Sequence, residues 1–493
     1  MSDEQYRNVF LKTIVVASIV CLPIYAATPR RACEFVSSIG VNTHFGYTDE
    51  PYYSQADSLS KLLGALGVTF IRDGIDDSNW KRTSKIQDSI FRKYGIKMLA
   101  CVGPRLPGTW PTPLDTTTAS TKRLIDTMRV RYGDAILAIE GPNEYDLSHG
   151  TAETDWVKAL SSYVQMLARV IRADAAYSHL PIVAPSLCFG HESQVGDISS
   201  FIDFGNTHSY PGGNSPATGL ATNIVNAQKT CMTKPIWATE TGYHTAINQP
   251  ASQGHPGMSE EAQARYIPRL FAEYFRAGIY KTSTYEFLDE RDNPANDDME
   301  QHFGLVRFDC SVKPAYTALK NLIAVLRDDT AAFAPASFSY TLAGDTANVR
   351  TVPLQKQNGH VFLLVWQECT SYDLATKQLL NPSARHVTLS FAVQPQLIQL
   401  YRVSASPAPY SQQSNISALS LDVPDEILVV EYVPKATGLI SSRSISSRLG
   451  LKVASKSIVG LAGPFPHGTI ITMQGKRMQM TGARTAQCVI HKN

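Results

Sequence analysis

The feature that most constrains the fold is a regular alternation of short apolar segments and longer amphipathic segments between about residues 38 and 328. The short segments are rich in β-branched residues and end at turn residues, which predicts strands, and the longer segments have helical spacing. The eight predicted strands are 39–44, 68–72, 96–102, 135–139, 181–186, 204–208, 235–239 and 282–287. Helices are predicted between them, for example over 55–66, 83–94, 120–131 and 156–173.

Eight strand–helix units in this length of chain fit a (β/α)8 barrel better than an open doubly wound sheet. A dinucleotide-binding fold would need a GxGxxG motif after its first strand, and no such motif follows the strand at 39–44. We therefore predict an α/β fold, a TIM barrel, over residues 28–330.

The character of the sequence changes after Arg327-Asp328-Asp329, where helical spacing stops and short alternating segments begin. This pattern predicts an all-β sandwich over residues 331–434, and its lack of a row of exposed aromatics favours a packing role. The predicted strands are 338–343, 347–352, 361–366, 386–392, 397–403 and 427–432. Residues 435–493 form a basic tail without clear periodicity, and we predict no structure for it.

The N-terminus and the overall charge bear on location and partners. Arg7 and Lys12 precede the apolar stretch 13–26, which predicts a signal peptide over residues 1–27 and a secreted, periplasmic or cell-envelope protein. An uncleaved membrane anchor stays open, because neither plausible cut has a small residue three positions before it. The net charge is +2 without a basic stripe carrying aromatics, so no nucleic acid is expected as a partner, and we expect a monomer. The eight cysteines are too irregularly spaced for a disulfide scaffold or a zinc site.

Two of the predicted barrel strands are followed closely by carboxylates. Glu144 follows the strand at 135–139 in the segment Glu-Gly-Pro-Asn-Glu, and Glu240 ends the segment 235–240. A charge at the end of a buried strand is costly, and the C-terminal ends of barrel strands form the active face. The two carboxylates therefore indicate a pair placed to cleave a glycosidic bond by acid/base and nucleophilic chemistry.

In this ordered set the sequence resembles clan A of the retaining glycoside hydrolases, with family 5 or family 39 as the related groups. The resemblance rests on Asn143-Glu144 after strand four, Glu240 on strand seven, Arg72 on strand two and His208-Ser209-Tyr210 on strand six, and it covers about residues 38–328. It implies that Glu144 is the acid/base and Glu240 the nucleophile. Two places depart from the family 5 pattern: Tyr145 stands where a proline is usual, and strand eight lacks its tryptophan.

Chemistry gives a reason for each of these residue types. Arg72 and Tyr210 would keep Glu240 ionised and fix its orientation, while Asn143 would donate to the sugar 2-hydroxyl. Glu144 must begin protonated, and we expect the negative charge of Glu240 to raise its pKa. No metal and no cofactor are required.

Further substrate contacts are predicted at His44, His208, Tyr243 and Glu286. Among the aromatic residues suited to stacking on sugar rings, Trp110 is the candidate for a sugar platform. The aromatics predicted in loops are Tyr47, Tyr52, Trp80, Trp110, Tyr145 and Tyr243. Glu140 lies deeper in the barrel and is predicted to be a structural partner of Arg72 or of a histidine.

Together these features predict a secreted retaining glycoside hydrolase that cleaves β-glycosidic bonds of an oligo- or polysaccharide through a covalent glycosyl-enzyme. The alternative is a catalytically inactive carbohydrate-binding or cell-envelope protein on the same fold. A metal-dependent barrel hydrolase is disfavoured, because it would want a His-X-His motif on strand one and only His44 stands there.

Overall fold

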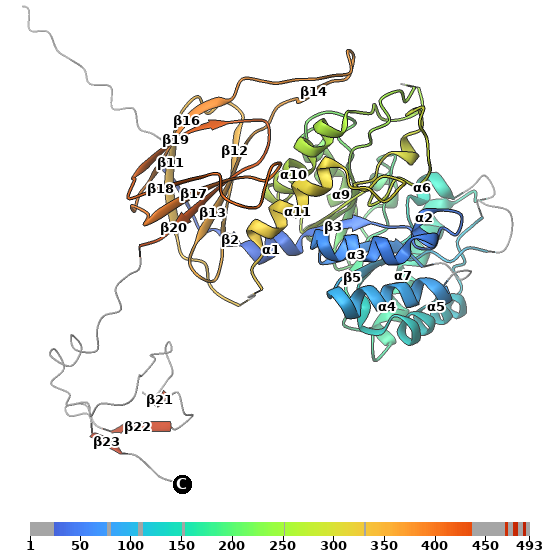
Figure 1. Ribbon diagram of the computed structural model, residues 1–493. Helices are drawn as coiled ribbons and strands as arrows, with labels where there is room; N and C mark the ends of the chain where they lie inside the picture. The colour runs from blue at the N-terminus through green and yellow to red at the C-terminus, as the bar shows by residue number, and fades with distance from the viewer. Residues whose placement is uncertain are drawn as a thin grey trace, which may run out of the picture. The chain divides into compact units, whose positions relative to one another are not determined.

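The structure is a computed structural model that describes residues 24–75, 80–106, 112–149, 153–250, 252–329 and 332–435, with 469–471, 477–481 and 487–489. The chain divides into two compact units, Met1–Lys435 and Ala436–Asn493. The first unit contains a barrel and two larger antiparallel sheets, shown in Figure 1. The second unit is described by the antiparallel strands β21 (Thr469–Ile471), β22 (Arg477–Thr481) and β23 (Gln487–Val489), for which no structure was predicted.

Eight parallel strands form the barrel, in the order β7-β6-β5-β4-β3-β10-β9-β8. Their bounds are β3 Ile39–Asn42, β4 Phe70–Gly74, β5 Lys97–Cys101, β6 Ile136–Glu140, β7 Ile182–Val183, β8 Gly205–His208, β9 Ile236–Thr241 and β10 Lys281–Thr284. A parallel bridge between Val183 and Phe204 joins the two ends of this sheet. Each strand overlaps a predicted one, so the predicted barrel is confirmed.

Helices lie between successive strands, and the four that we predicted are present. Their bounds include α3 Ala56–Leu66, α4 Trp80–Tyr94, α5 Thr118–Arg131 and α7 Trp156–Ala173. In α3 the buried residues Leu59, Leu63 and Leu66 recur at helical spacing, and the helix ends at Gly67, whose φ of 88° suits a residue without a Cβ. The other helices are α1 Ala32–Ser37, α2 Pro51–Ser54, α6 Tyr145–Ser148, α8 Glu192–Val195, α9 Leu220–Cys231, α10 Glu260–Arg276, α11 Pro314–Leu326, η1 Gly133–Ala135 and η2 Met299–Gln301.

A layer of apolar side chains fills the interior of the barrel. A Cβ at position 40 would lie 2.3 Å from the Phe70 ring, so the glycine there leaves room for that ring. The layer consists of Phe70, Leu99, Ala138, Val183 and Trp237. The barrel is therefore a packed core, and the polar residues of its strands gather at their C-terminal ends.

The second part of the first unit is a β-sandwich. Its four-stranded sheet has the order β1-β11-β16-β19 and its six-stranded sheet the order β18-β17-β20-β13-β12-β2. All six predicted strands are present. The bounds are β1 Ile24–Ala27, β2 Arg30–Arg31, β11 Phe338–Gly344, β12 Val349–Gln355, β13 Val361–Gln367, β16 Arg385–Phe391, β17 Leu397–Arg402, β18 Ser411–Ser414, β19 Ala418–Val423 and β20 Leu428–Val433, with a hairpin of β14 Tyr372–Asp373 and β15 Gln378–Leu379.

The sandwich packs against the barrel through strand β13, which is buried on both faces. One face contributes Val361, Leu363 and Val365 to the sandwich core. Side chains of the other face, including Leu364 and Trp366, join the same hydrophobic cluster as the barrel helices. This arrangement supports the packing role that we predicted for the sandwich.

A buried arginine adds polar contacts between the two parts. Arg269 on α10 is 0% exposed and donates hydrogen bonds to Glu368 at 3.0 Å, the Cys369 carbonyl at 2.8 Å, Ser371 at 3.0 Å and the Asp425 carbonyl at 3.0 Å. The guanidinium is fully buried, and the Glu368 carboxylate balances its positive charge.

The N-terminal segment bears on the predicted signal peptide. Strand β1, at the end of the predicted signal peptide, pairs with β11, while residues 1–23 lie outside the described part. None of the helices that the structure describes is both long enough and apolar enough to span a membrane. The cysteines Cys33, Cys101, Cys188, Cys231, Cys310 and Cys369 are free.

Candidate active site

A cavity of about 1080 Å³ opens at the C-terminal ends of the barrel strands. Its size is at the upper end of ligand pockets in proteins. Residues from most of the strand ends line it, among them His44, Tyr47, Arg72, Asp73, Arg105, Asn143, Glu144, His208, Tyr210, Glu240, Tyr285, Glu300 and Phe303.

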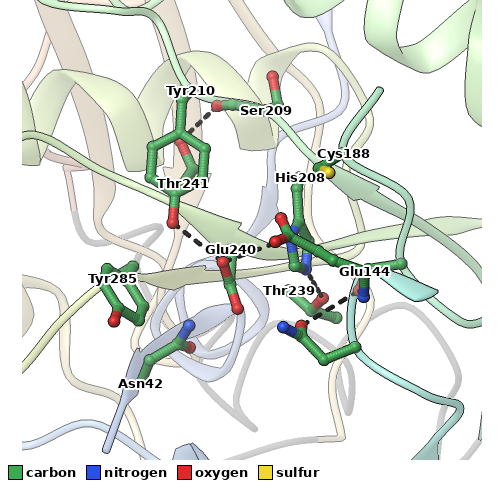
Figure 2. Close-up of polar contacts among 12 residues, drawn as sticks. Asn42, Glu144, Cys188, His208, Ser209, Tyr210, Thr239, Glu240, Thr241 and Tyr285 are labelled. Carbon is green, nitrogen blue, oxygen red and sulfur yellow. Dashed lines mark hydrogen bonds and ion pairs between the residues drawn. The ribbon is translucent and has the colours of Figure 1, made fainter. Parts of the chain in front are cut away.

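Glu240 lies on β9 with both carboxylate oxygens held in place. Arg72 donates from Nη1 to Oε1 at 2.6 Å, and the Tyr210 hydroxyl donates to Oε2 at 3.0 Å. The Glu240 side chain is 9% exposed. Figure 2 shows Tyr210 directed at this carboxylate. The pair of donors that the sequence predicted around Glu240 is therefore present.

Arg72 connects Glu240 to a second, deeper carboxylate. Its Nε and Nη2 donate to the two oxygens of Glu140 at 2.6 and 2.9 Å, and Nη2 also donates to Asn143 Oδ1 at 2.6 Å. Glu140 is 0% exposed and also accepts from Asn206 and Thr239. The prediction that Glu140 is a structural partner of Arg72 is confirmed.

Glu144 follows β6 in a constrained backbone. Its φ is 39°, in the left-handed region that residues with a Cβ rarely adopt. Its N–H donates to Ser186 Oγ at 3.0 Å, and the Ser186 hydroxyl donates to Asn143 Oδ1 at 3.2 Å. Because Oδ1 accepts from both Arg72 and Ser186, the amide nitrogen of Asn143 is the group available to a ligand.

His208 contacts both candidate catalytic carboxylates, and Figure 2 shows the three side chains together. Its Nδ1 is 2.7 Å from Glu144 Oε1 and 3.3 Å from Glu240 Oε2, and its Nε2 is 3.2 Å from Thr239 Oγ1. One oxygen of Glu144, one oxygen of Glu240 and a ring nitrogen of His208 all lie within 4.8 Å of one another. The two carboxylates are therefore as close as direct attack on one sugar carbon requires.

The electrostatics of Glu144 differ from what the sequence predicted. Burial raises the pKa of Glu144, but the hydrogen bond and positive charge of His208 outweigh burial and bring it below its ordinary value. Burial lowers the pKa of His208, but the Glu240 charge and the bond to Glu144 leave it raised. The expectation of a raised pKa for Glu144 is therefore wrong, because the contact with His208 lowers it.

The remaining predicted contacts fall in different places. His44 lines the cavity. Tyr243 is 2% exposed and donates to the Asn214 carbonyl, and Glu286 is 0% exposed and accepts from Tyr52, so neither lines the cavity. Trp110 lies outside the described residues. Of the other aromatic candidates, Tyr47 lines the cavity, whereas Tyr52 and Tyr145 are fully buried.

The cavity residues that the sequence reasoning missed include Tyr285, Glu300 and Phe303. Tyr285 follows β10 and Phe303 packs edge-on against it at 5.1 Å, while Glu300 accepts from the Tyr285 hydroxyl at 3.2 Å. The predicted strand ran to residue 287, but β10 ends at Thr284. The signal for Tyr285 was its aromatic ring near the end of strand eight. Glu300 lies in the short helix η2 and Phe303 follows it in a loop, where the sequence has no periodicity.

No protein-family model matches the sequence, and no curated protein matches it. Among solved structures, a family 39 glycoside hydrolase from Bacteroides cellulosilyticus WH2 is 16% identical with a TM-score of 0.56, over 82% of each chain. The family 39 enzyme from Xanthomonas axonopodis pv. citri is 15% identical with a TM-score of 0.54, over 83% of this chain and 96% of that one. A glucosidase from Croceicoccus marinus is 12% identical with a TM-score of 0.52, over 76% and 91%. The chain thus shares the fold of these glycoside hydrolases.

Proposed function

We propose that this protein is a retaining glycoside hydrolase that cleaves β-glycosidic bonds of an oligo- or polysaccharide. The observation that carries the proposal is the approach of Glu144 and Glu240, whose oxygens lie within 4.8 Å of each other in the cavity. Retaining enzymes hold their two carboxyl groups about 5 to 5.5 Å apart, and inverting enzymes about 6.5 to 9.5 Å apart. One oxygen of each carboxylate lies within 4.8 Å of the other, which is nearer to the shorter of these spacings and favours the retaining mechanism.

In the first step Glu240 attacks the anomeric carbon. The Glu240–carbon bond forms while the bond from that carbon to the leaving oxygen breaks, and Glu144 gives its proton to the leaving oxygen. Arg72 and Tyr210 hold the attacking carboxylate in one orientation. Asn143 supplies an amide N–H to the 2-hydroxyl as positive charge develops on the ring.

In the second step the glycosyl-enzyme is hydrolysed. Glu144 takes a proton from water, the water oxygen bonds to the anomeric carbon, and Glu240 leaves as a carboxylate. The proton for each first step is held by the pair of Glu144 and His208, which share it across 2.7 Å. Sugar binding removes water from the pair, and desolvation favours the neutral state with the proton on Glu144.

The same proposal covers the organisation of the chain. Residues 28–330 form the catalytic barrel and 331–434 the supporting sandwich, after removal of a signal peptide of residues 1–27. The location is then outside the cell or in the cell envelope, and no metal or cofactor enters the reaction steps above. The mass of the protein recovered from the medium or periplasm would show whether cleavage occurs after Ala27.

The test is hydrolysis of a panel of aryl β-glycosides and β-linked oligosaccharides, with Glu240→Gln as the matched inactive variant. We expect turnover by the wild type, a loss of several orders of magnitude in the variant, and a first product that NMR shows to have the β-configuration. An α-configured first product would contradict the retaining mechanism. If the wild type and the variant are equally inert and both bind glycan, the protein is a carbohydrate-binding protein and the enzyme proposal fails.

A further inference from the structure

Behind one wall of the cavity, three potential metal ligands converge from two barrel strands. His44 follows β3, and Glu286 and Glu290 follow β10. A ring nitrogen of His44 and one oxygen from each glutamate all lie within 4.8 Å of one another. Glu286 is 0% exposed and Glu290 is 7% exposed, so this group is not an ordinary solvated acidic surface.

Two buried polar atoms of the group have no hydrogen-bond partner among the described residues, although buried polar atoms normally have one. Within the described residues, Glu286 Oε1 and His44 Nε2 accept or donate no hydrogen bond, although Nε2 lies 3.6 Å from Glu286 Oε2. Glu50 lies beside them, is 6% exposed, and its Oε2 also has no hydrogen-bond partner. Unpaired buried carboxylate oxygens destabilise a fold unless a bound cation neutralises their charge.

Little positive charge reaches this group from the described part of the protein. Arg291 is the neighbouring cation, but its Nη2 is 3.7 Å from Glu50 Oε1, its side chain is 57% exposed, and its shorter contact is to Asp49 at 2.7 Å.

We propose that His44, Glu286 and Glu290 bind one divalent transition-metal ion of the Zn²⁺ type. A nitrogen and two carboxylate oxygens are ligand types that Zn²⁺ takes, and they would fill three corners of a four-coordinate site. The imidazole favours Zn²⁺ over Ca²⁺, which takes six to eight oxygen ligands.

Neighbouring side chains fix the orientation of two of these ligands. The Tyr52 hydroxyl donates to Glu286 Oε2 at 2.9 Å and accepts from the Leu288 N–H at 3.1 Å. The His44 ring stacks on Tyr47 with centroids 4.4 Å apart and an angle of 12° between the planes. Such supporting contacts are what oriented metal ligands require.

The ion would act as a structural clamp between the ends of β3 and β10. His44 and Tyr47 also line the cavity, so a fixed imidazole would hold this wall in place. This role does not depend on the glycosidase proposal, because binding can be measured on inactive protein.

The experiment uses the full chain after treatment with a chelator. Titration calorimetry with Zn²⁺ should give one site per chain, and the melting temperature should rise with Zn²⁺ concentration. Glu290→Gln and Glu286→Gln should abolish this site, and Tyr52→Phe should weaken Zn²⁺ about 10- to 100-fold. The matched control is Glu431→Gln, since Glu431 is also buried and bonds a tyrosine, Tyr401, and a histidine, His360, but lies in the sandwich. It should bind Zn²⁺ like the wild type.

Several results would overturn the assignment. No Zn²⁺ binding by the folded wild type would refute it, as would a Ca²⁺ affinity above that for Zn²⁺. Glu144, His208 and Glu240 also form a trio within 4.8 Å, so binding that survives in Glu290→Gln but is lost in Glu240→Gln would place the ion at the catalytic pair instead. Circular dichroism of each variant separates a lost site from a lost fold, and Tyr52→Phe keeps the test open if a glutamine variant fails to fold.

Discussion

Replacing Arg72 by methionine tests the charge balance beneath the proposed nucleophile. The guanidinium donates four hydrogen bonds of 2.6 to 2.9 Å to Glu140, Glu240 and Asn143. Glu140 is 0% exposed and Glu240 7%, so both carboxylates would stay buried without their cation. Removing one partner from a buried ion pair costs about 3–5 kcal/mol, and we expect a loss of stability of this size.

Activity should fall with stability in this variant. Loss of the donor to Glu240 removes an interaction that orients the attacking oxygen, and losses of this kind reduce kcat by about 10²- to 10³-fold. The assays are urea unfolding at neutral pH and the kcat of the fraction that stays folded. The matched control is Arg105→Met, because Arg105 lines the same cavity but donates to the Thr112 carbonyl and to Ser148.

A double variant makes this reasoning falsifiable. Adding Glu140→Gln to Arg72→Met removes the carboxylate that the arginine neutralises most closely, so part of the lost stability should return. The account of Arg72 is refuted if Arg72→Met loses less than about 1 kcal/mol, as an exposed pair would. It is equally refuted if the second substitution adds its full cost to the first.

Three other substitutions give separate tests. The pKa of His208 is raised, so kcat/KM of the wild type should fall only as the pH rises past the ordinary histidine value of about 6.5. In His208→Gln, Glu144 holds the proton alone, so this fall in kcat/KM should occur at lower pH. A fall at the same pH as in the wild type would contradict proton sharing. Arg269→Ala should lower the free energy of unfolding in urea by about 3–5 kcal/mol, because it leaves the buried Glu368 carboxylate without its cation. The double variant with Glu368→Gln should recover part of that loss. Tyr285→Ala should lower kcat/KM by up to about tenfold, mainly by raising KM, because it removes about 0.5–1.5 kcal/mol of stacking on the sugar. An unchanged KM would show that the sugar does not stack on Tyr285.

The barrel could be predicted because the hydrophobic periodicity and the turn residues mark the same element boundaries along the chain. Residues 156–173 have helical spacing throughout, and the observed helix α7 has the same bounds. Of the sandwich strands that were missed, β19 alternates exposed and buried residues and could have been found, whereas β2 and β18 carry weaker signals. Strand β18 is polar along its whole length, and β2 has two arginines whose pairing with β12 depends on tertiary structure.

The position of the proposed catalytic pair could be predicted because parallel strands in a barrel end on one face. Arg72, Glu144, Tyr210 and Glu240 need only correct strand assignments to be placed together. The effect of His208 on Glu144 could not be predicted, since it depends on a contact of 2.7 Å between side chains from two strands. Glu286 was predicted at the cavity, but β10 ends earlier than expected, so Tyr285 lies there and Glu286 is buried behind it.

The most direct test of the catalytic assignment is chemical rescue of Glu240→Gly by azide. The truncated variant leaves space for azide to attack the anomeric carbon from the side that Glu240 occupies, while Glu144 still protonates the leaving group. With an activated aryl β-glycoside that the wild type hydrolyses, we predict restored turnover and an α-glycosyl azide, of inverted configuration. No rescue in the presence of an active wild type, or a β-glycosyl azide, would contradict the assignment of Glu240 as the nucleophile.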